Sequence, residues 1–321
     1  MKFPFLGTGI NWRKSPAHLL LLTKFMKPSD SSWFAKDAWN SVLGESSAKA
    51  IDRFVSDKVI QLGSVAEKMD AKFKVTELKE MLQKRDLPVS GNKPVLIQRL
   101  IENDPAFMKK LTNNLKIYYC TAEGKSIAEA YKNLMAQERD TAEKHAMEAL
   151  KKHKWEQACQ IIADYEAAQV FPRGMNMDWK KYNSQRDLQM LSVIFEKTPK
   201  ILIKVSKENL QYLRIAAALM YLWGTNDAKK WLPQDFNAGL AMDTDASARM
   251  LVFHSYHLTN LARDKSMGIK RVKILGANDG RTCKACKAIV GKTFSIDKAP
   301  ELPNPECTCI DGCRCTTIAD I

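Results

Sequence analysis

Residues 74–100 read Lys74-Val-Thr-Glu-Leu-Lys-Glu-Met-Leu-Gln-Lys-Arg-Asp-Leu-Pro-Val-Ser-Gly-Asn-Lys-Pro-Val-Leu-Ile-Gln-Arg-Leu100, and this stretch predicts two short helices joined by an extended connector. Each predicted helix carries its apolar residues on one face, namely Leu78, Met81 and Leu82 on the first and Leu96, Ile97 and Leu100 on the second. Between them, Pro88 biases Leu87 away from helical backbone angles. The stretch therefore predicts a helical hairpin with its own small core.

The second helix of this hairpin begins where several helix-start signals come together. Gly91 supplies a free turn, Ser90 or Asn92 can cap the helix, and Pro94 suits its first turn. The whole pattern resembles the SAP motif, a helix–extended–helix module that generally binds DNA and sometimes RNA. The resemblance covers about 30 of the 321 residues and defines a SAP-like unit at residues 73–104.

The resemblance implies contacts between this unit and nucleic-acid phosphates, centred on the N-terminus of the second helix. The residues that it implies for DNA binding are Lys84, Arg85, Ser90, Gly91, Lys93 and Arg99. Helix N-terminal amides and nearby cations both favour anions, and phosphate contacts carry no sequence specificity. The alternative is a hairpin that contacts only protein, with its lysines merely solvated.

The basic charge of the chain is concentrated in the region that contains this unit. Its formal net charge is +14 with a pI near 9.3, and residues 1–120 hold 20 basic against 12 acidic side chains. An acidic partner is expected there, although Lys-rich solubility alone gives the same numbers. Hydrophobic residues at 45% and charged residues at 27% are typical of globular proteins.

Helical patterns dominate the rest of the chain up to residue 265. We expect helices within 32–69, 126–168, 183–195, 206–223 and 245–263, after an irregular arm at 1–30. After Gly268 the pattern changes, because Arg271–Ile274 alternates like a short strand and no helical period follows. The predicted organisation is mainly α, with an N-terminal helical region (1–72), the SAP-like unit (73–104), a helical body (105–244) and a β-and-loop module (245–321).

Six of the eight cysteines cluster in that last module. They are Cys283, Cys286, Cys307, Cys309, Cys313 and Cys315. Two closely spaced pairs across a loop are typical of a tetrahedral structural zinc site, and Cys283 with Cys286 is the firmest pair. We rank Cys307 and Cys309 above Cys313 and Cys315. The last two are spare, or a second ion shares ligands. Disulfides or free thiols are the alternative.

The sequence around these cysteines resembles a second protein family. It consists of Asn260-Leu-Ala-Arg, the run from Asp279 to Phe294, and the closing Leu302-Pro-Asn-Pro-Glu-Cys-Thr-Cys. These resemble the C-terminal module of phage head morphogenesis proteins, the minor head proteins typified by protein F of phage Mu. Asn304 stands where that family usually has histidine, which favours a cysteine-only site. The resemblance implies a minor structural role beside the portal, and no catalysis.

Catalytic signatures are not found in the sequence. His254 and His257 share one helix face and could bind a metal with a carboxylate, but such pairs are more often packing residues. No histidine follows His257, as a zinc-braced His–Asn–His nuclease would require. We find no Gly-rich phosphate loop and no nucleophile elbow.

Together these features predict a structural phage or prophage minor head protein that contacts DNA and portal or capsid proteins, located in the virion or host cytoplasm. We expect no enzyme activity, small-molecule substrate or membrane. The longest apolar run, Ile215–Trp223, is half a membrane span, and no secretory signal is seen. The alternatives are a cellular SAP-type nucleic-acid-binding accessory or regulatory protein with a structural zinc site and, third, a metal-dependent nuclease.

Overall fold

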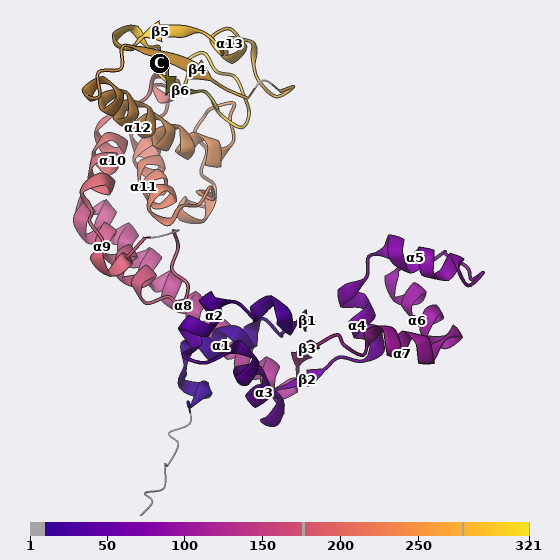
Figure 1. The fold of residues 1–321 in the computed structure, drawn as a ribbon. Helices are drawn as coiled ribbons and strands as arrows, with labels where there is room; N and C mark the ends of the chain where they lie inside the picture. The colour runs from indigo at the N-terminus through magenta and orange to yellow at the C-terminus, as the bar shows by residue number, and fades with distance from the viewer. Residues whose placement is uncertain (1–9, 175–176, 278, 321) are drawn as a thin grey trace, which may run out of the picture. The chain divides into compact units, whose positions relative to one another are not determined.

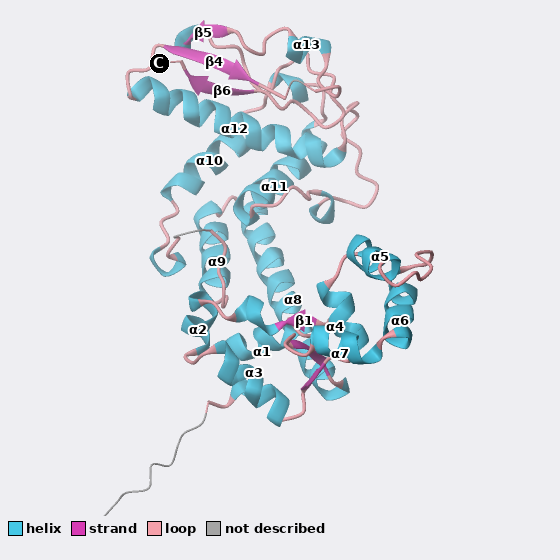
Figure 2. Ribbon diagram, turned by 45° about the vertical axis from the view of Figure 1, so that its right-hand side comes forward, coloured by secondary structure: helices cyan, strands magenta, loops and turns pink. Residues whose placement is uncertain are grey.

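The computed structural model describes residues 10–174, 177–277 and 279–320. The chain divides into two compact units, which we call the N-terminal unit (residues 1–138) and the C-terminal unit (residues 139–321). Most of the described chain is helical, and its strands form two small antiparallel sheets (Figures 1 and 2). The expectation of a mainly helical protein is therefore confirmed. Among the described residues, the structure contains no helix with the length and apolar character of a membrane span.

The N-terminal unit contains short helices and short strands. Its elements are α1 (Pro16–Thr23), β1 (Ser29–Asp30), α2 (Asp37–Leu43), α3 (Ser47–Ser56), β2 (Ile60–Leu62), α4 (Val65–Lys72), α5 (Val75–Gln83), α6 (Lys93–Asn103), α7 (Pro105–Thr112) and β3 (Ile117–Cys120), with 3-10 turns at Trp12–Lys14 and Ser31–Phe34. Helix α8 (Ala122–Lys151) follows and contains the division between the two units.

A three-stranded sheet in this unit corrects the prediction that the chain is all-α up to residue 265. The strands lie in the order β1-β3-β2, and β3 pairs antiparallel with both neighbours. The helical pattern expected over residues 32–69 is also interrupted, because α3 ends at Ser56 and Ile60–Leu62 is a strand. Strands of two to four residues are too short to show a period of their own. Their identity depends on partners distant in the sequence.

The pairing of β2 with β3 explains how the SAP-like unit joins the N-terminal unit. Leu62 lies opposite Tyr118, and the Gly63 N–H donates to the Ile117 carbonyl over 2.8 Å. Residues 64–116 therefore leave and return through adjacent antiparallel strands. The segment containing α4 to α7 is an excursion between two strands that remain paired with each other.

A break at residues 152–154, between α8 and α9 (Trp155–Ala167), interrupts the helical pattern expected at 126–168. The break between them contains neither glycine nor proline. His153 adopts a left-handed φ of 55° there, which is uncommon for a side chain with a Cβ. The Trp155 ring stacks on Phe195, with centroids 5.3 Å apart. The first residue of α9 therefore packs against another part of the chain directly after the turn.

The C-terminal unit contains the remaining helices and the second sheet. Its further elements are α10 (Gln185–Glu196), α11 (Lys207–Trp223), α12 (Thr244–Ser266), β4 (Arg271–Leu275), α13 (Lys284–Lys287), β5 (Thr293–Ser295) and β6 (Thr316–Ala319), with 3-10 turns at Trp179–Lys181, Lys200–Leu202, Lys229–Trp231 and Ile296–Lys298. The strand expected at residues 271–274 is confirmed. It is the centre of the sheet β5-β4-β6.

Helices α11 and α12 form the core of this unit. The Ser206 hydroxyl caps α11 by accepting from the Asn209 N–H at 3.2 Å, and Gly224 ends it with a φ of 60°. Helix α12 packs against α10 and α11 and lies beside the sheet on its other side (Figure 1). The same buried core continues into the loops that carry Cys307 and Cys313. One core thus joins the predicted helical body to the predicted cysteine module.

Candidate nucleic-acid interface and metal centre

The SAP-like unit has a closed apolar core. Leu78 and Leu82 of α5 and Leu96 and Leu100 of α6 are fully buried, as the spacing predicted. Met69 of α4 and Met108 of α7 are also fully buried in this core, although both lie outside the unit predicted at residues 73–104. Four helices rather than two therefore enclose it.

The start of α6 is held by Asn92, one of the two caps expected. Its side-chain oxygen accepts from the Val95 N–H at 3.3 Å, so this amide of the first turn already has an acceptor. Gly91 has a φ of 117°, and a Cβ at this position would lie 2.9 Å from Cγ1 of Val95. Glycine is therefore needed at this turn both for its backbone angle and for the space beside the helix.

Arg99 and Lys93, both expected at phosphates, have partners within the protein. The Arg99 guanidinium donates to the carbonyl of Pro88 and, at 3.0 Å, to that of Ser90, so it holds the connector against α6. The Lys93 ammonium donates to the Asp70 carbonyl and lies 3.2 Å from the Asp70 carboxylate. Asp70, on α4, was not singled out from the sequence, because its partner lies 23 residues away.

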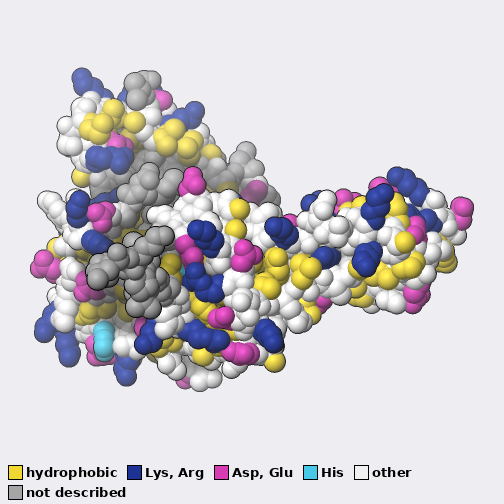
Figure 3. All heavy atoms as spheres, turned by 60° about the horizontal axis from the view of Figure 1, so that its bottom comes forward, with side chains coloured by type: hydrophobic (Ala, Val, Ile, Leu, Met, Phe, Trp, Pro, Cys, Tyr) yellow, Lys and Arg dark blue, Asp and Glu magenta, His cyan; other side chains and the backbone are white. Residues whose placement is uncertain are grey.

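Of the other four predicted contact residues, one has partners within the protein and three are exposed. Arg85 donates to the Met81 carbonyl at 3.0 Å and covers the Phe107 ring at 4.7 Å, whereas Lys84, Ser90 and Gly91 are exposed. Residues 71–105 hold seven Lys and Arg against five Asp and Glu. The part formed by α4 to α7, at the right of Figure 3, accordingly shows basic side chains interspersed with acidic and hydrophobic ones. The interface is thus only weakly basic.

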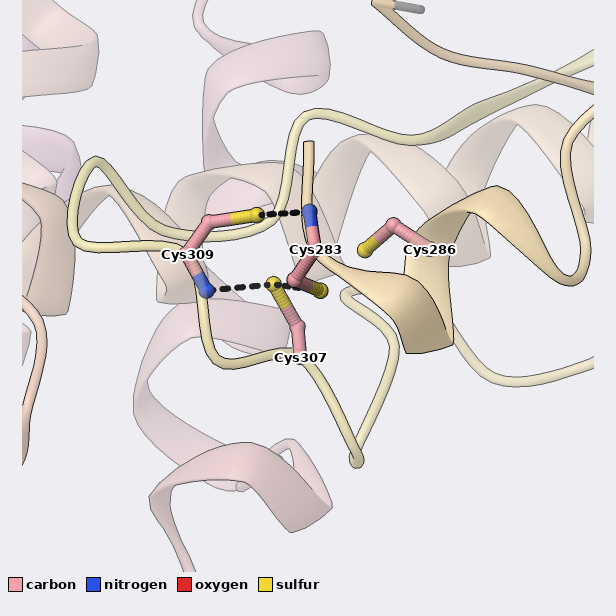
Figure 4. A group of neighbouring side chains, drawn as sticks. All are labelled: Cys283, Cys286, Cys307 and Cys309. Atoms are coloured by element: carbon pink, nitrogen blue, oxygen red, sulfur yellow. Dashed lines mark hydrogen bonds between the residues drawn. The ribbon is translucent and has the colours of Figure 1, made fainter. Parts of the chain in front are cut away.

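The six clustered cysteines lie close enough to hold a metal ion. The thiol sulfurs of one group, Cys283, Cys286, Cys307 and Cys309, all lie within 4.8 Å of one another (Figure 4). Cys286 also belongs to a second such group with Cys313 and Cys315. A tetrahedral ion with zinc–sulfur bonds of about 2.3 Å places its sulfurs about 3.8 Å apart. Cys283 and Cys307 have sulfurs 3.9 Å apart, which fits this geometry.

Backbone N–H groups point at the sulfurs of the first group. Cys283 donates its N–H to Sγ of Cys309 at 3.3 Å, and Cys309 donates to Sγ of Cys307 at 3.4 Å, as Figure 4 shows. Burial raises the pKa of Cys283, but hydrogen bonds to its sulfur, from the N–H groups of Thr308 and Cys286 and from neighbouring cysteine side chains, together outweigh burial and lower that pKa to about 6. Such donors stabilise the thiolate, the form that binds metals. The cysteines are free thiols in this structure.

An ion pair ties together the loops that carry the cysteines. Arg314 donates two hydrogen bonds of 2.8 Å to the Asp279 carboxylate, and Thr282 donates a third of 3.0 Å. Hydrogen bonding by Arg314 is the main reason that the pKa of Asp279 lies well below its usual range. The pair connects the turn before Cys283 to the residue between Cys313 and Cys315.

Asn304, singled out in the sequence analysis, makes its hydrogen bonds within the loops that carry the cysteines. Its backbone N–H donates to Sγ of Cys313 at 3.2 Å. Its side-chain oxygen accepts from the Glu306 N–H at 3.1 Å. The side chain is therefore committed to the turn of its own loop.

His254 and His257 pack against the segment that leads into the cysteine loop. Nδ1 of His254 lies 2.9 Å from the Leu302 carbonyl oxygen. Burial, reinforced by His254, lowers the pKa of His257 to about 4. Within the described ranges, neither histidine belongs to a group of side chains that could hold a metal. The packing interpretation of this pair agrees with these contacts.

Comparisons with known proteins bear on the first of the two sites. Residues 71–105 match the SAP domain family, over the segment that contains α5, the connector and α6. Searches of curated proteins and of solved structures give no match. A SAP domain indicates nucleic-acid binding. Residues 71–105 are thus a SAP domain, carried between two paired strands of the N-terminal unit.

Proposed function

We propose that this chain is a structural, non-enzymatic DNA-binding protein. Its SAP domain would contact duplex phosphates without sequence preference, and its C-terminal unit would supply protein contacts. The observation that carries the proposal is the SAP match, together with a hydrophobic core that places α5, the connector and α6 as that motif requires.

The proposed DNA contacts follow from the exposure and partners of the predicted residues. Lys84, Ser90 and Gly91 are exposed and can meet a phosphate directly. Lys93 can exchange Asp70 for a phosphate, because the Asp70 side chain is 57% exposed and exposed ion pairs contribute only about 0–1 kcal/mol. Arg99 acts as a positioning residue that shapes the connector.

We assign a structural Zn²⁺ to the four cysteines Cys283, Cys286, Cys307 and Cys309. Thiolates at tetrahedral spacing favour zinc over the hard cations that prefer oxygen ligands. When bound, the ion would fasten α13 to the loop at residues 307–309, which lies in the core beneath. All four positions are protein ligands, so the site has a structural rather than a catalytic composition.

The finer proposal is a minor head protein of a phage or prophage, with portal or capsid proteins as partners. It rests on the resemblance of residues 260–315 to head morphogenesis modules. Particles purified by density gradient should then contain the chain at a fixed low copy number. A chain that stays outside particles and binds DNA alone would favour the accessory or regulatory protein, and DNA cleavage with added divalent metal would favour the nuclease.

Excision of the SAP excursion tests the DNA-binding proposal. Because Leu62 and Tyr118 are paired, residues 64–116 can be replaced by a tight Asn-Gly turn that joins β2 to β3 as a hairpin. The excised chain should lose binding to duplexes of unrelated sequence, measured by fluorescence anisotropy. A cooperative unfolding transition of the remaining N-terminal unit, beside an unchanged one of the C-terminal unit, shows that the excised chain is folded. Undiminished duplex binding would contradict the proposal.

A further inference from the structure

We propose that the six clustered cysteines bind two metal ions rather than one, with Cys286 as a thiolate bridge between them. The inference rests on the zinc site of the proposed function and extends it. The structure brings together two groups of thiols that share one sulfur, whereas a single tetrahedral ion uses only the first group.

Cys286 is the bridge that the geometry of the two groups identifies. Its sulfur lies within 4.8 Å of every other sulfur in each group. The distance from Sγ of Cys286 to Sγ of Cys313 is 3.9 Å, against about 3.8 Å for two sulfurs on one tetrahedral zinc. A thiolate keeps lone pairs after binding one ion, so it can bind a second.

The ligands of each ion follow from this single bridge. The first ion takes Cys283, Cys286, Cys307 and Cys309, which complete a tetrahedron. The 3.9 Å between the sulfurs of Cys283 and Cys307 fits that geometry. The second ion takes Cys286, Cys313 and Cys315, so one of its four positions is left for a water molecule. The terminal ligands are then Cys283, Cys307 and Cys309 on one ion, and Cys313 and Cys315 on the other.

The surroundings of the second group resemble those of the first. Cys313 is fully buried and Cys315 is 7% exposed, yet Sγ of Cys313 accepts the Asn304 N–H at 3.2 Å. Two divalent ions with six thiolates leave a net charge of about −2. N–H donors to sulfur offset part of that charge.

Metal content of the full chain, purified without chelator and measured by mass spectrometry, tests the number of ions. Wild type should hold two zinc ions per chain. Cys315→Ser removes a terminal ligand of the second ion only and should leave one, whereas Cys286→Ser removes a ligand of both and should leave fewer than one. Cys120→Ser, outside the cluster, is the matched control and should keep two.

Cadmium-113 NMR of the wild-type chain tests the bridge itself and needs no variant to fold. Two cadmium resonances coupled through a shared thiolate are expected. Two uncoupled resonances would overturn the bridge. One ion per chain, unchanged in Cys315→Ser, would overturn the inference and leave the single zinc site intact, and a metal-free chain would overturn both.

Discussion

The ammonium group of Lys93 lies 3.2 Å from the carboxylate of Asp70, so the lysine at the start of α6 already has an anionic partner on α4, directly before the SAP domain. DNA must compete with that carboxylate. We expect Asp70→Asn to tighten duplex binding about two- to five-fold at low salt, the equivalent of about 0.5–1 kcal/mol for an exposed pair. Fluorescence anisotropy measures the change.

Asp86→Asn is the matched control for this variant. Asp86 is an exposed acid of the SAP domain with a φ of 54°, a backbone angle that asparagine tolerates. An equal gain from both variants would indicate a general charge effect, and the specific role of the Lys93–Asp70 pair would be contradicted.

Lys84 and Lys93 should each contribute one phosphate contact. Replacing either with alanine is expected to weaken binding equally for unrelated duplex sequences. Each variant should also flatten the slope of log K against log salt by about 0.9. Lys204→Ala removes an exposed lysine from the C-terminal unit and should leave the slope unchanged. A slope that neither variant alters would indicate a hairpin that contacts only protein.

Arg99 should act on the connector rather than on DNA directly. Arg99→Ala removes the donor to the Pro88 and Ser90 carbonyls, so the domain should lose about 1–2 kcal/mol of stability. Hydrogen exchange of residues 84–92 in the full chain should quicken. Arg99→Lys keeps the charge but lacks the planar fork, and it should rescue protection only in part. Weaker DNA binding with unchanged exchange would instead identify Arg99 as a phosphate contact.

Loss of metal should destabilise the whole C-terminal unit. Its core runs without interruption from α11 and α12 into the cysteine loops, so we expect chelation to lower the unfolding temperature of this unit by more than about 10 °C. Cys283→Ser with Cys286→Ser should do the same. Calorimetry should show the transition of the N-terminal unit unchanged. Loss of only the loop structure, with helical circular dichroism intact, would show that residues 245–321 form a separate module.

His257 should make the stability of this unit depend on pH. Burial lowers its pKa from 6.5 to about 4, so the folded state favours the neutral ring. The unfolded state therefore binds more protons between these values. The stabilising contribution is fully present above pH 6.5 and is lost as pH falls toward 4. Histidine NMR should give a pKa near 4 in the full chain, and His257→Gln should flatten the stability curve over this window.

Local patterns were sufficient for much of the fold. The spacing of Leu78 and Leu82, and of Leu96 and Leu100, predicted both SAP helices, because a helix face is set by residues three and four apart. The N-cap of the second SAP helix was narrowed to Ser90 or Asn92. Only the structure decides for Asn92, because its side-chain oxygen accepts from the Val95 N–H. Cysteine spacing likewise predicted a metal-binding cluster, but it did not decide which cysteines lie together in each group.

The sequence by itself thus determined the two SAP helices, most of the longer helices and the cysteine cluster, all of which depend on neighbours a few residues away. The prediction of an irregular arm at residues 1–30 was wrong, because Pro16–Thr23 forms helix α1. The tertiary structure decided what distant residues do to one another. Ile60 becomes a strand because Cys120 pairs with it, and Lys93 is held because α4 brings Asp70 to it. Cys286 meets Cys313 across 27 residues. Such contacts are set by packing of whole elements, which no local period encodes.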